Sequence, residues 1–226
     1  MELQLGLNGH VFETGYAVLE ERGTAIVGMS PGNSYFKQKQ IRELLQEVSH
    51  RFAHIKIMIA DQPAIHTYRA LGYSRIEAER KARLNGNQLQ NYSHRSIEQI
   101  TAENPAAHIE LIEWKDKIDP HPAYQMGYLR VLDLYRNNAT FRKDARDTTK
   151  KVIQPKLKPS IELENAIDQG VQYLLQELGF IIAGPEMFGV PQLTYVYHDR
   201  WPVFENLVNG MYDDEVRNGV GSVVIQ

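Results

Sequence analysis

The sequence predicts an α/β fold with a Rossmann-like, mostly parallel central sheet flanked by helices, and three consecutive stretches support that prediction. Residues 24–27 form a short apolar, β-branched run that is typical of a buried strand. Apolar residues between Ile41 and Phe52 then recur at helical spacing, and residues 55–60 form a second buried strand. A strand, a helix and a strand in this order indicate the βαβ unit of a parallel sheet with a right-handed crossover.

Length and composition favour one globular domain over residues 1–226. The chain is 42% hydrophobic and 23% charged, and its 226 residues can bury a sizeable core. It contains no cysteine, which excludes disulfides, thiolate nucleophiles and cysteine-based metal sites. Because no apolar run approaches the roughly 18 residues that span a bilayer, we expect a cytoplasmic protein without a membrane partner. The net charge of −3 still allows a local basic patch.

Further periodic segments complete the predicted layout. The clearest helix opens near Ser160 and carries an apolar stripe from Ile167 to Leu178. We expect Gly179 to end this helix at the C′ position, with a buried strand following over residues 180–183. In an earlier helix, expected over residues 124–137, Tyr128, Leu129, Leu132 and Tyr135 share one face. The other expected strands are residues 3–7, 108–114, 192–197 and 220–225, and the other expected helices are 64–95, 124–137, 141–153 and 201–207.

Ser30 lies in the turn between the first buried strand and the helix after it. In open α/β sheets, ligands bind in the crevice at the carboxyl ends of the strands. Pro31 prevents regular structure in this turn, and Asn33 or Ser34 could cap the following helix. Gly28-x-Ser30-x-Gly32 also matches the nucleophile elbow of α/β-hydrolases, although that fold places several strands before its elbow. Ser30 is therefore either a nucleophile or a residue that merely caps a helix.

Two polar groups farther along the chain allow both a chemical and a structural interpretation. Tyr173 and Glu177 are four residues apart on one helix face, at the edge of the apolar stripe. Glu177 either pairs with a surface cation or lines a cavity, where it would suit an ammonium group. Tyr195 and Tyr197 lie on one side of an extended run that ends at His198, and are either core aromatics or members of a proton relay.

Two stretches are rich in lysine and arginine. In the first, pairs at i,i+4 such as Glu77 with Lys81 and Glu79 with Arg83 favour a solvated helix. Arg75, Arg80 and Arg95 have no such partner there, which favours phosphate contacts with a nucleic acid. The second stretch holds Arg142, Lys143, Arg146, Lys150, Lys151, Lys156 and Lys158.

Signatures of common cofactors do not occur in the sequence. There is no GxxxxGK[ST] loop, no GxGxxG after a strand and no HExxH spacing. We therefore expect no cofactor and no metal.

Five motifs occur in a characteristic order between Thr24 and Pro202. They are Gly28-Met29-Ser30-Pro31-Gly32-Asn33-Ser34-Tyr35-Phe36, Ala78-Glu79-Arg80-Lys81-Ala82-Arg83, Ala123-Tyr124-Gln125, Tyr173-x-x-x-Glu177, and Tyr197-His198 with Trp201. Together they resemble the cyclodipeptide synthases, which build a cyclic dipeptide from two aminoacyl-tRNAs. That family has a fold similar to the catalytic domain of class Ic aminoacyl-tRNA synthetases. Asn33, Tyr197 and His198 resemble the subgroup of the family that is named for Asn, Tyr and His.

The resemblance implies a role for each catalytic position. Ser30 would be the nucleophile that takes the first aminoacyl group, Tyr173 and Glu177 would hold its α-amino group, and Tyr197 would relay protons. An aminoacyl-tRNA is already an activated ester, so transfer to a serine exchanges one ester for another and needs no ATP. Such an aminoacyl-enzyme predicts ping-pong kinetics.

The resemblance also implies where the two substrates bind. A pocket for the first amino acid would open beside Gly28, with Asn33 and His198 contributing. We expect its candidate walls to be Ile26, Met58 and Ala60, unless Tyr195 brings a hydroxyl to that wall. The tRNA would bind to the basic helix through Arg75, Arg80, Lys81 and Arg83. The chain would be a monomer or a homodimer.

Two other functions remain open on the sequence alone. Ser30 could serve a serine hydrolase or acyltransferase, which would require a catalytic triad. Alternatively, the basic stretches could belong to a non-catalytic tRNA-binding module, in which Ser30 would have no measurable role.

Overall fold

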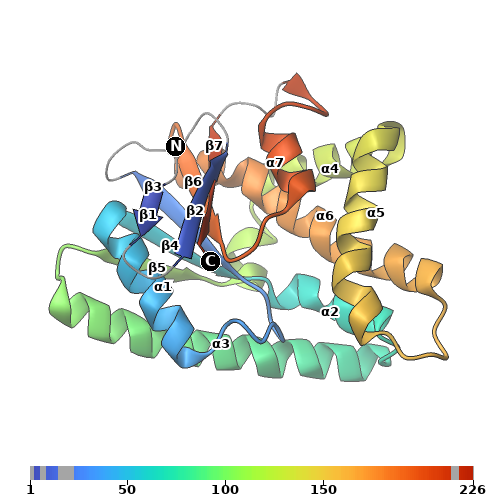
Figure 1. The fold of residues 1–226 in the computed structure, drawn as a ribbon, viewed down its shortest axis with the longest axis horizontal. Coiled ribbons are helices and arrows are strands. Elements are labelled where there is room, and N and C mark those ends of the chain that lie inside the picture. Colours follow the sequence, from blue (N-terminus) through green and yellow to red (C-terminus); the bar gives the residue numbers. More distant parts are fainter. Residues whose placement is uncertain (1–2, 6–8, 15–22, 215–218, 226) are drawn as a thin grey trace.

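One sheet organises the molecule, and Figure 1 shows it between two groups of helices. The computed structural model describes residues 3–5, 9–14, 23–214 and 219–225. Over those residues the sheet has seven strands in the order β1-β2-β7-β6-β3-β4-β5. β7, β6, β3, β4 and β5 are parallel, whereas β1 and β2 run antiparallel at one edge. The strands are β1 Leu3–Leu5, β2 Gly9–Thr14, β3 Thr24–Met29, β4 His54–Ile59, β5 His108–Ile112, β6 Leu193–Tyr197 and β7 Val220–Ile225.

The helices pack in two groups. α6 lies against α2, α4 and α5, and α1 lies against α3 (Figure 1). The helices are α1 Gln38–Arg51, α2 Asp61–Ala70, α3 Arg75–Glu103, α4 Pro122–Asn137, α5 Ala139–Ile153, α6 Leu163–Phe188 and α7 Pro202–Val208. A π-helical turn, Trp114–Ile118, follows β5, and a 3₁₀ turn, Gln154–Lys156, follows α5. The predicted α/β fold with a mostly parallel sheet is confirmed.

The register of the central strands decides which side chains meet. Tyr195 of β6 is paired with Ile26 of β3, so their side chains share a face of the sheet. Gly184 of α6 lies against Ile26 on that face. Met29 points to the opposite face, where Ser93 of α3 contacts its sulfur. In the sheet, β4 lies on one side of β3 and β6 lies on the other. The strand order therefore reverses at β3, and the β3–β6 junction is a topological switch point.

The prediction that Gly179 ends the long helix was wrong. α6 continues through Gly179 and Pro185, and ends at Gly189 in the left-handed conformation, with φ of 62°. The strand expected over residues 180–183 is therefore a part of α6. Gly179 is needed for packing, because a Cβ there would lie 2.7 Å from the Tyr128 Cα of α4.

Other differences from the expected layout are local. The segment 64–95 contains two helices, because Gly72 adopts a φ of 84° between α2 and α3 and Ser74 begins α3 with a capping box to Glu77. On α4, Tyr128, Leu132 and Tyr135 of the shared face pack against the core, whereas Leu129 is 58% exposed. Leu7 of the expected edge strand lies outside the described residues. Of the helices that the structure describes, none has an apolar stretch long enough to cross a membrane.

Candidate active site

Ser30 directly follows β3, and its hydroxyl meets two tyrosines from distant parts of the chain. Its Oγ lies 2.8 Å from the hydroxyl oxygen of Tyr173 on α6. It also lies 2.8 Å from the hydroxyl oxygen of Tyr197, the last residue of β6. The helix that carries Tyr173 and Glu177 thus faces the serine. The alternative role of this turn as a helix cap was wrong for Asn33 and Ser34, because α1 has Lys37 at its N-cap position and no side-chain cap.

Glu177 is the buried acid of this group. It lies one helical turn after Tyr173 and is 0% exposed. Its Oε1 accepts a hydrogen bond of 2.8 Å from Tyr195, whereas its Oε2 accepts none from the described part of the chain. Burial raises the pKa of Glu177 to about 7, although hydrogen bonds from Tyr195 and Tyr173 oppose the shift. A buried carboxylate with a free oxygen is suited to receive a cation.

Gly28 makes room for Tyr195 to reach Glu177. A Cβ at Gly28 would lie 2.0 Å from the Tyr195 hydroxyl oxygen, so only glycine leaves space for the phenol. The tyrosine therefore occupies the space beside Gly28 in which the sequence predicted a substrate pocket. Gly28 supports the acid indirectly, through the position of Tyr195.

The tyrosines around Ser30 are neutral phenols. Burial and the nearby Glu177 raise the pKa of Tyr173 well above its ordinary value. The same causes, in the same order, raise the pKa of Tyr197. Neutral hydroxyls can donate one hydrogen bond while accepting another, so both residues can pass a proton to or from Ser30 without forming a phenolate.

Asn33 and His198 join the loop after β3 to the end of β6. The side-chain amide of Asn33 donates to His198 Nε2 at 2.8 Å, and its Oδ1 accepts from the Tyr35 backbone N–H. The His198 ring is stacked on Tyr35 with centroids 4.3 Å apart. Burial lowers the pKa of His198, which favours the neutral ring with Nε2 as acceptor. These contacts fix the loop that presents Ser30.

A cavity of about 150 Å³ opens beside Ser30. Its lining is mostly apolar and includes groups that the sequence did not indicate, because they belong to α5 and reach the site only through its packing on α6. These are Thr148, Thr149, Val152 and Ile153. Gly170 and Leu174 of α6 also line the cavity. Ile26, Met58 and Ala60 are fully buried and are not among the residues that line this cavity.

The basic residues of α3 differ in whether they already have a partner within the protein. Arg75 is paired with Glu79 at 2.8 Å, so the prediction that it lacks a partner was wrong. Lys81 lies over the Tyr73 ring, 4.6 Å from its centroid. Arg80 and Arg83 border an open groove together with Lys115. Over the described ranges, no group of three histidine or acidic side chains could hold a metal ion.

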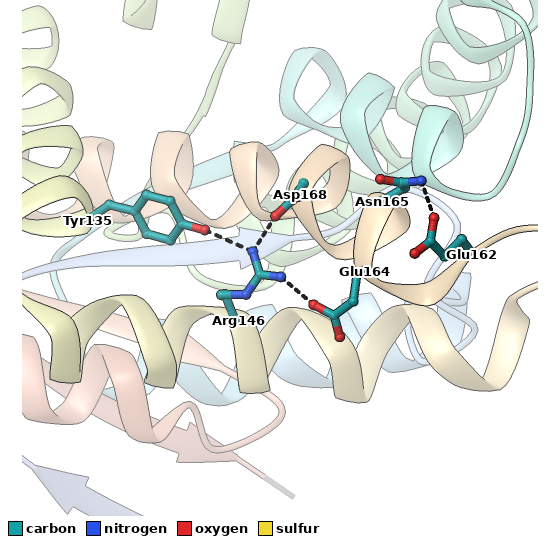
Figure 2. A network of polar contacts seen from close by, with 6 residues as sticks. All are labelled: Tyr135, Arg146, Glu162, Glu164, Asn165 and Asp168. Atoms are coloured by element: carbon teal, nitrogen blue, oxygen red, sulfur yellow. Dashed lines mark hydrogen bonds and ion pairs between the residues drawn. The ribbon is translucent and has the colours of Figure 1, made fainter.

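Two residues of the second basic stretch, Lys143 and Arg146, form ion pairs within the protein. Figure 2 shows the Arg146 guanidinium of α5 between Asp168 and Glu164 of α6, with the Tyr135 hydroxyl beside it. Lys143 is paired with Asp147 on α5 at 2.8 Å. Arg146 and Lys143 therefore contribute less to a phosphate-binding surface than the sequence suggested.

Comparisons with known proteins identify the family of the chain. The family model described as "Cyclodipeptide synthase" matches residues 11–226. The cyclo(L-leucyl-L-leucyl) synthase of Bacillus subtilis (strain 168) is 26% identical over 215 residues, covering 92% of this chain and 84% of the relative. The cyclo(L-tyrosyl-L-tyrosyl) synthase of Mycobacterium tuberculosis (strain ATCC 25618 / H37Rv) is 25% identical over 184 residues, covering 81% and 63%.

Solved structures share the fold. A cyclodipeptide synthase from Bacillus thermoamylovorans superposes with a TM-score of 0.83 at 22% identity, over 96% of each chain. One from Candidatus Glomeribacter gigasporarum, bound to Phe-tRNAPhe, gives 0.65 at 16% identity over 92% of this chain and 89% of that one. Tyrosyl-tRNA synthetase from Archaeoglobus fulgidus gives 0.50 at 16% identity over 91% and 55%. Because the family model covers all but residues 1–10, the chain belongs to the cyclodipeptide synthase family of enzymes.

Proposed function

We propose that this enzyme joins amino acids from two aminoacyl-tRNAs into a cyclic dipeptide through an aminoacyl-enzyme on Ser30. The observation that carries the proposal is the position of the Ser30 Oγ, 2.8 Å from the hydroxyls of both Tyr173 and Tyr197. A nucleophile in reach of groups that can move its proton is the arrangement that covalent catalysis needs. Asn33, Tyr197 and His198 support placement in the Asn-Tyr-His subgroup, since their side chains meet in one cluster.

In the first step Ser30 takes the aminoacyl group from the first tRNA. The Ser30 Oγ forms a bond to the ester carbonyl carbon, and the bond between that carbon and the ribose oxygen breaks. The proton of Ser30 passes through a tyrosine hydroxyl to the departing ribose oxygen. One ester replaces another, so the step is near energetic balance and needs orientation more than driving force.

Glu177 acts on the α-amino group of the bound residue. Its free Oε2 holds the ammonium form, and a carboxylate with a pKa of about 7 can also take a proton from it near neutral pH. The resulting amine attacks the ester carbonyl of the second aminoacyl-tRNA. An amide bond forms, the second tRNA leaves with a free ribose hydroxyl, and a dipeptide remains on Ser30.

Ring closure releases the product. The free amine of the dipeptide attacks the Ser30 ester, a second amide forms, and the Oγ of Ser30 regains a proton through Tyr197. Both amide-forming steps convert an ester into a more stable amide, so both are downhill. The cyclic dipeptide then leaves.

The cavity beside Ser30 is the right size for one amino-acid side chain. Its volume of about 150 Å³ is similar to that of an engineered protein cavity that binds benzene. Its lining is mainly apolar, with Val152, Ile153 and Leu174, but Thr149 brings in a buried hydroxyl that has no partner among the described residues. We infer that a bound aminoacyl group places its side chain there.

The tRNA binds along α3. Arg80 and Arg83 are exposed on the outer face of this helix, and Lys115 faces the same groove. These side chains contact phosphates and position the acceptor end without reading its sequence.

A serine hydrolase is less well supported. The hydroxyl partners of Ser30 are tyrosines, and His198 Nε2 is engaged by Asn33. A histidine in contact with the serine is what a hydrolytic triad would require.

Expression in a bacterium, with mass spectrometry of the culture medium, tests the proposal. We expect cyclic dipeptides from the wild type and none from Ser30→Ala. Ser160→Ala is the matched control, because Ser160 is exposed and lines neither the cavity nor the pocket beside the serine loop, and it should leave production unchanged. Equal production by wild type and Ser30→Ala, or no production by a folded wild type, would refute the proposed function.

A further inference from the structure

A second pocket lies against the loop that follows Ser30. It is open, with a volume of about 240 Å³. Gly32 and Asn33 border both this pocket and the cavity beside Ser30. The opposite wall of the second pocket comes from the middle of α3, where Asn85, Gln88 and Tyr92 line it. The serine loop therefore has a mostly apolar cavity on one side and a pocket with a larger polar share on the other.

The walls of this second pocket carry primary amides and an aromatic ring. The Gln88 amide donates to the Tyr92 hydroxyl at 2.8 Å, and both groups reach solvent. The Asn85 amide donates to the Tyr68 hydroxyl. No described residue donates to the amide oxygen of Asn85 or of Gln88. Lys37 at the rim is exposed and adds a positive charge, and the buried Leu89 adds an apolar surface.

The chemistry of the substrate restricts where its nucleoside can lie. In an aminoacyl-tRNA, the reacting ester is attached directly to the ribose of the terminal adenosine. A productive attack brings the ester carbonyl to within about 3–3.5 Å of the Ser30 Oγ. The terminal adenosine must then lie against the serine loop. The mostly apolar cavity suits the amino-acid side chain, which leaves the amide-lined pocket for the nucleoside.

We propose, on the basis of the function proposed above, that this pocket binds the terminal adenosine of an aminoacyl-tRNA during transfer to Ser30. Adenine presents a donor beside an acceptor, which is the pattern that one primary amide can pair with. Gln88 pairs with this edge of the base, and the Tyr92 ring provides a surface on which a base stacks. Lys37 neutralises the adjoining phosphate.

The position of the pocket on α3 fits the approach of the tRNA. Gln88 follows Arg80 by eight residues on the same helix, which at 1.5 Å per residue is a separation of about 12 Å along the axis. Arg80 and Arg83 can therefore hold the acceptor end while its terminal nucleotide reaches the pocket. The basic part of α3 and its amide-bearing part therefore follow one another along the same helix.

The proposal is tested by comparing the wild type with Gln88→Ala, using two different acyl donors. One donor is an aminoacyl-tRNA, and the other is a dinitrobenzyl ester of the same amino acid, which has no nucleoside. The rate of Ser30 acylation is followed by mass spectrometry of the intact protein. We expect Gln88→Ala to slow acylation by subsaturating aminoacyl-tRNA about tenfold, the loss that one base-pairing amide typically causes, and to leave acylation by the simple ester unchanged. Gln99→Ala is the control, because Gln99 is an exposed amide on α3, eleven residues beyond Gln88, that lines neither the pocket nor the groove beside Arg80 and Arg83.

A competition experiment needs no variant. Adenosine 5′-monophosphate should slow acylation of the wild type by aminoacyl-tRNA, and should do so less in Gln88→Ala, whereas cytidine 5′-monophosphate should have little effect on either.

Three results would overturn the proposal. Gln88→Ala could react with aminoacyl-tRNA at the wild-type rate, it could lose reactivity equally with both donors, or the two nucleotides could compete equally. If the wild type takes no aminoacyl group from either donor, the proposed function itself fails. This outcome is distinguishable from the other three, because it is seen with the wild type alone.

Discussion

Glu177 is a residue at which folding and the proposed catalysis have opposite requirements. Its carboxyl is completely buried, and Oε2 has no partner within the described residues, so burial raises its pKa to about 7. In the unfolded chain the same carboxyl titrates near its ordinary value of 4.5. The folded protein therefore binds more protons than the unfolded one between these two values. Stability consequently falls as the pH rises through this window and remains reduced above it.

Glu177→Gln should stabilise the protein at pH 8. The pKa of Glu177 is 4.5 in the unfolded chain and about 7 in the folded protein. Removing this titration should raise the unfolding free energy by up to about 3 kcal/mol at pH 8 and should change it little at pH 4. Denaturant unfolding at the two pH values measures the effect. Glu205 is the control, since it is a mostly buried carboxylate with an Arg200 partner at 2.6 Å, and Glu205→Gln should destabilise at pH 8. The same change in stability for Glu177→Gln at both pH values would contradict the account.

Single residues of the candidate site differ in how far the sequence could predict them. Tyr173 and Glu177 share a helix face by their spacing alone, and Ser30 lies at a strand end that can be recognised locally. The contact between Gly28 and Tyr195 was only one alternative on the sequence, because it depends on the register of β3 against β6. That register joins segments far apart in the sequence, and no local pattern encodes it.

At the scale of secondary structure, α6 shows where local patterns mislead. Its apolar stripe and its start were predictable from helical spacing, but its end was not. Gly179 follows a helical pattern in the way that a C′ glycine does, yet it allows α4 to approach closely. Pro185 also lies inside α6, although proline usually ends a helix. Tertiary packing therefore overrides both local signals.

Arg146 of α5 forms ion pairs with Glu164 and Asp168 of α6 (Figure 2). These ion pairs keep α5, which forms one wall of the cavity, in contact with α6. Arg146→Ala should lower the unfolding free energy by about 1 kcal/mol, because it removes two partly exposed ion pairs. It should also raise KM for aminoacyl-tRNA severalfold, since Thr149 and Val152 lie on α5 within two turns of Arg146. Thermal unfolding and steady-state kinetics measure the two effects. Lys143→Ala removes an exposed pair within α5 and should change neither, so equal effects of the two variants would refute this role.

For the whole molecule, the fold class was predictable but the strand order was not. Strands and helices alternate in a way that favours a parallel sheet, and the sheet has five parallel strands in register. The sequence does not show that β6 and β7 extend the sheet beyond β3, because that pairing is long-range. This order places the ends of β3 and β6 side by side, and it thereby brings Ser30 to Tyr197.

Charge distribution over the whole molecule should govern tRNA binding more than the net charge of −3. The logarithm of kcat/KM should fall linearly with the logarithm of salt concentration, because phosphate contacts release counterions. Arg80→Ala and Arg83→Ala should each reduce that slope by about 1. Arg75→Ala should reduce it less, since Arg75 is already paired with Glu79. Kinetics over a salt series measure the slopes, and an unchanged slope in Arg80→Ala would rule out a phosphate contact there.

The covalent intermediate is the central claim, and mass spectrometry of the intact protein tests it directly. The enzyme is mixed with a single aminoacyl-tRNA, quenched in acid within milliseconds to seconds, and weighed. The account predicts a mass gain of one aminoacyl residue, located on Ser30 after proteolysis and absent in Ser30→Ala. A wild-type enzyme that makes cyclic dipeptide while showing no such adduct at any quench time, or an equal adduct in Ser30→Ala, would contradict it.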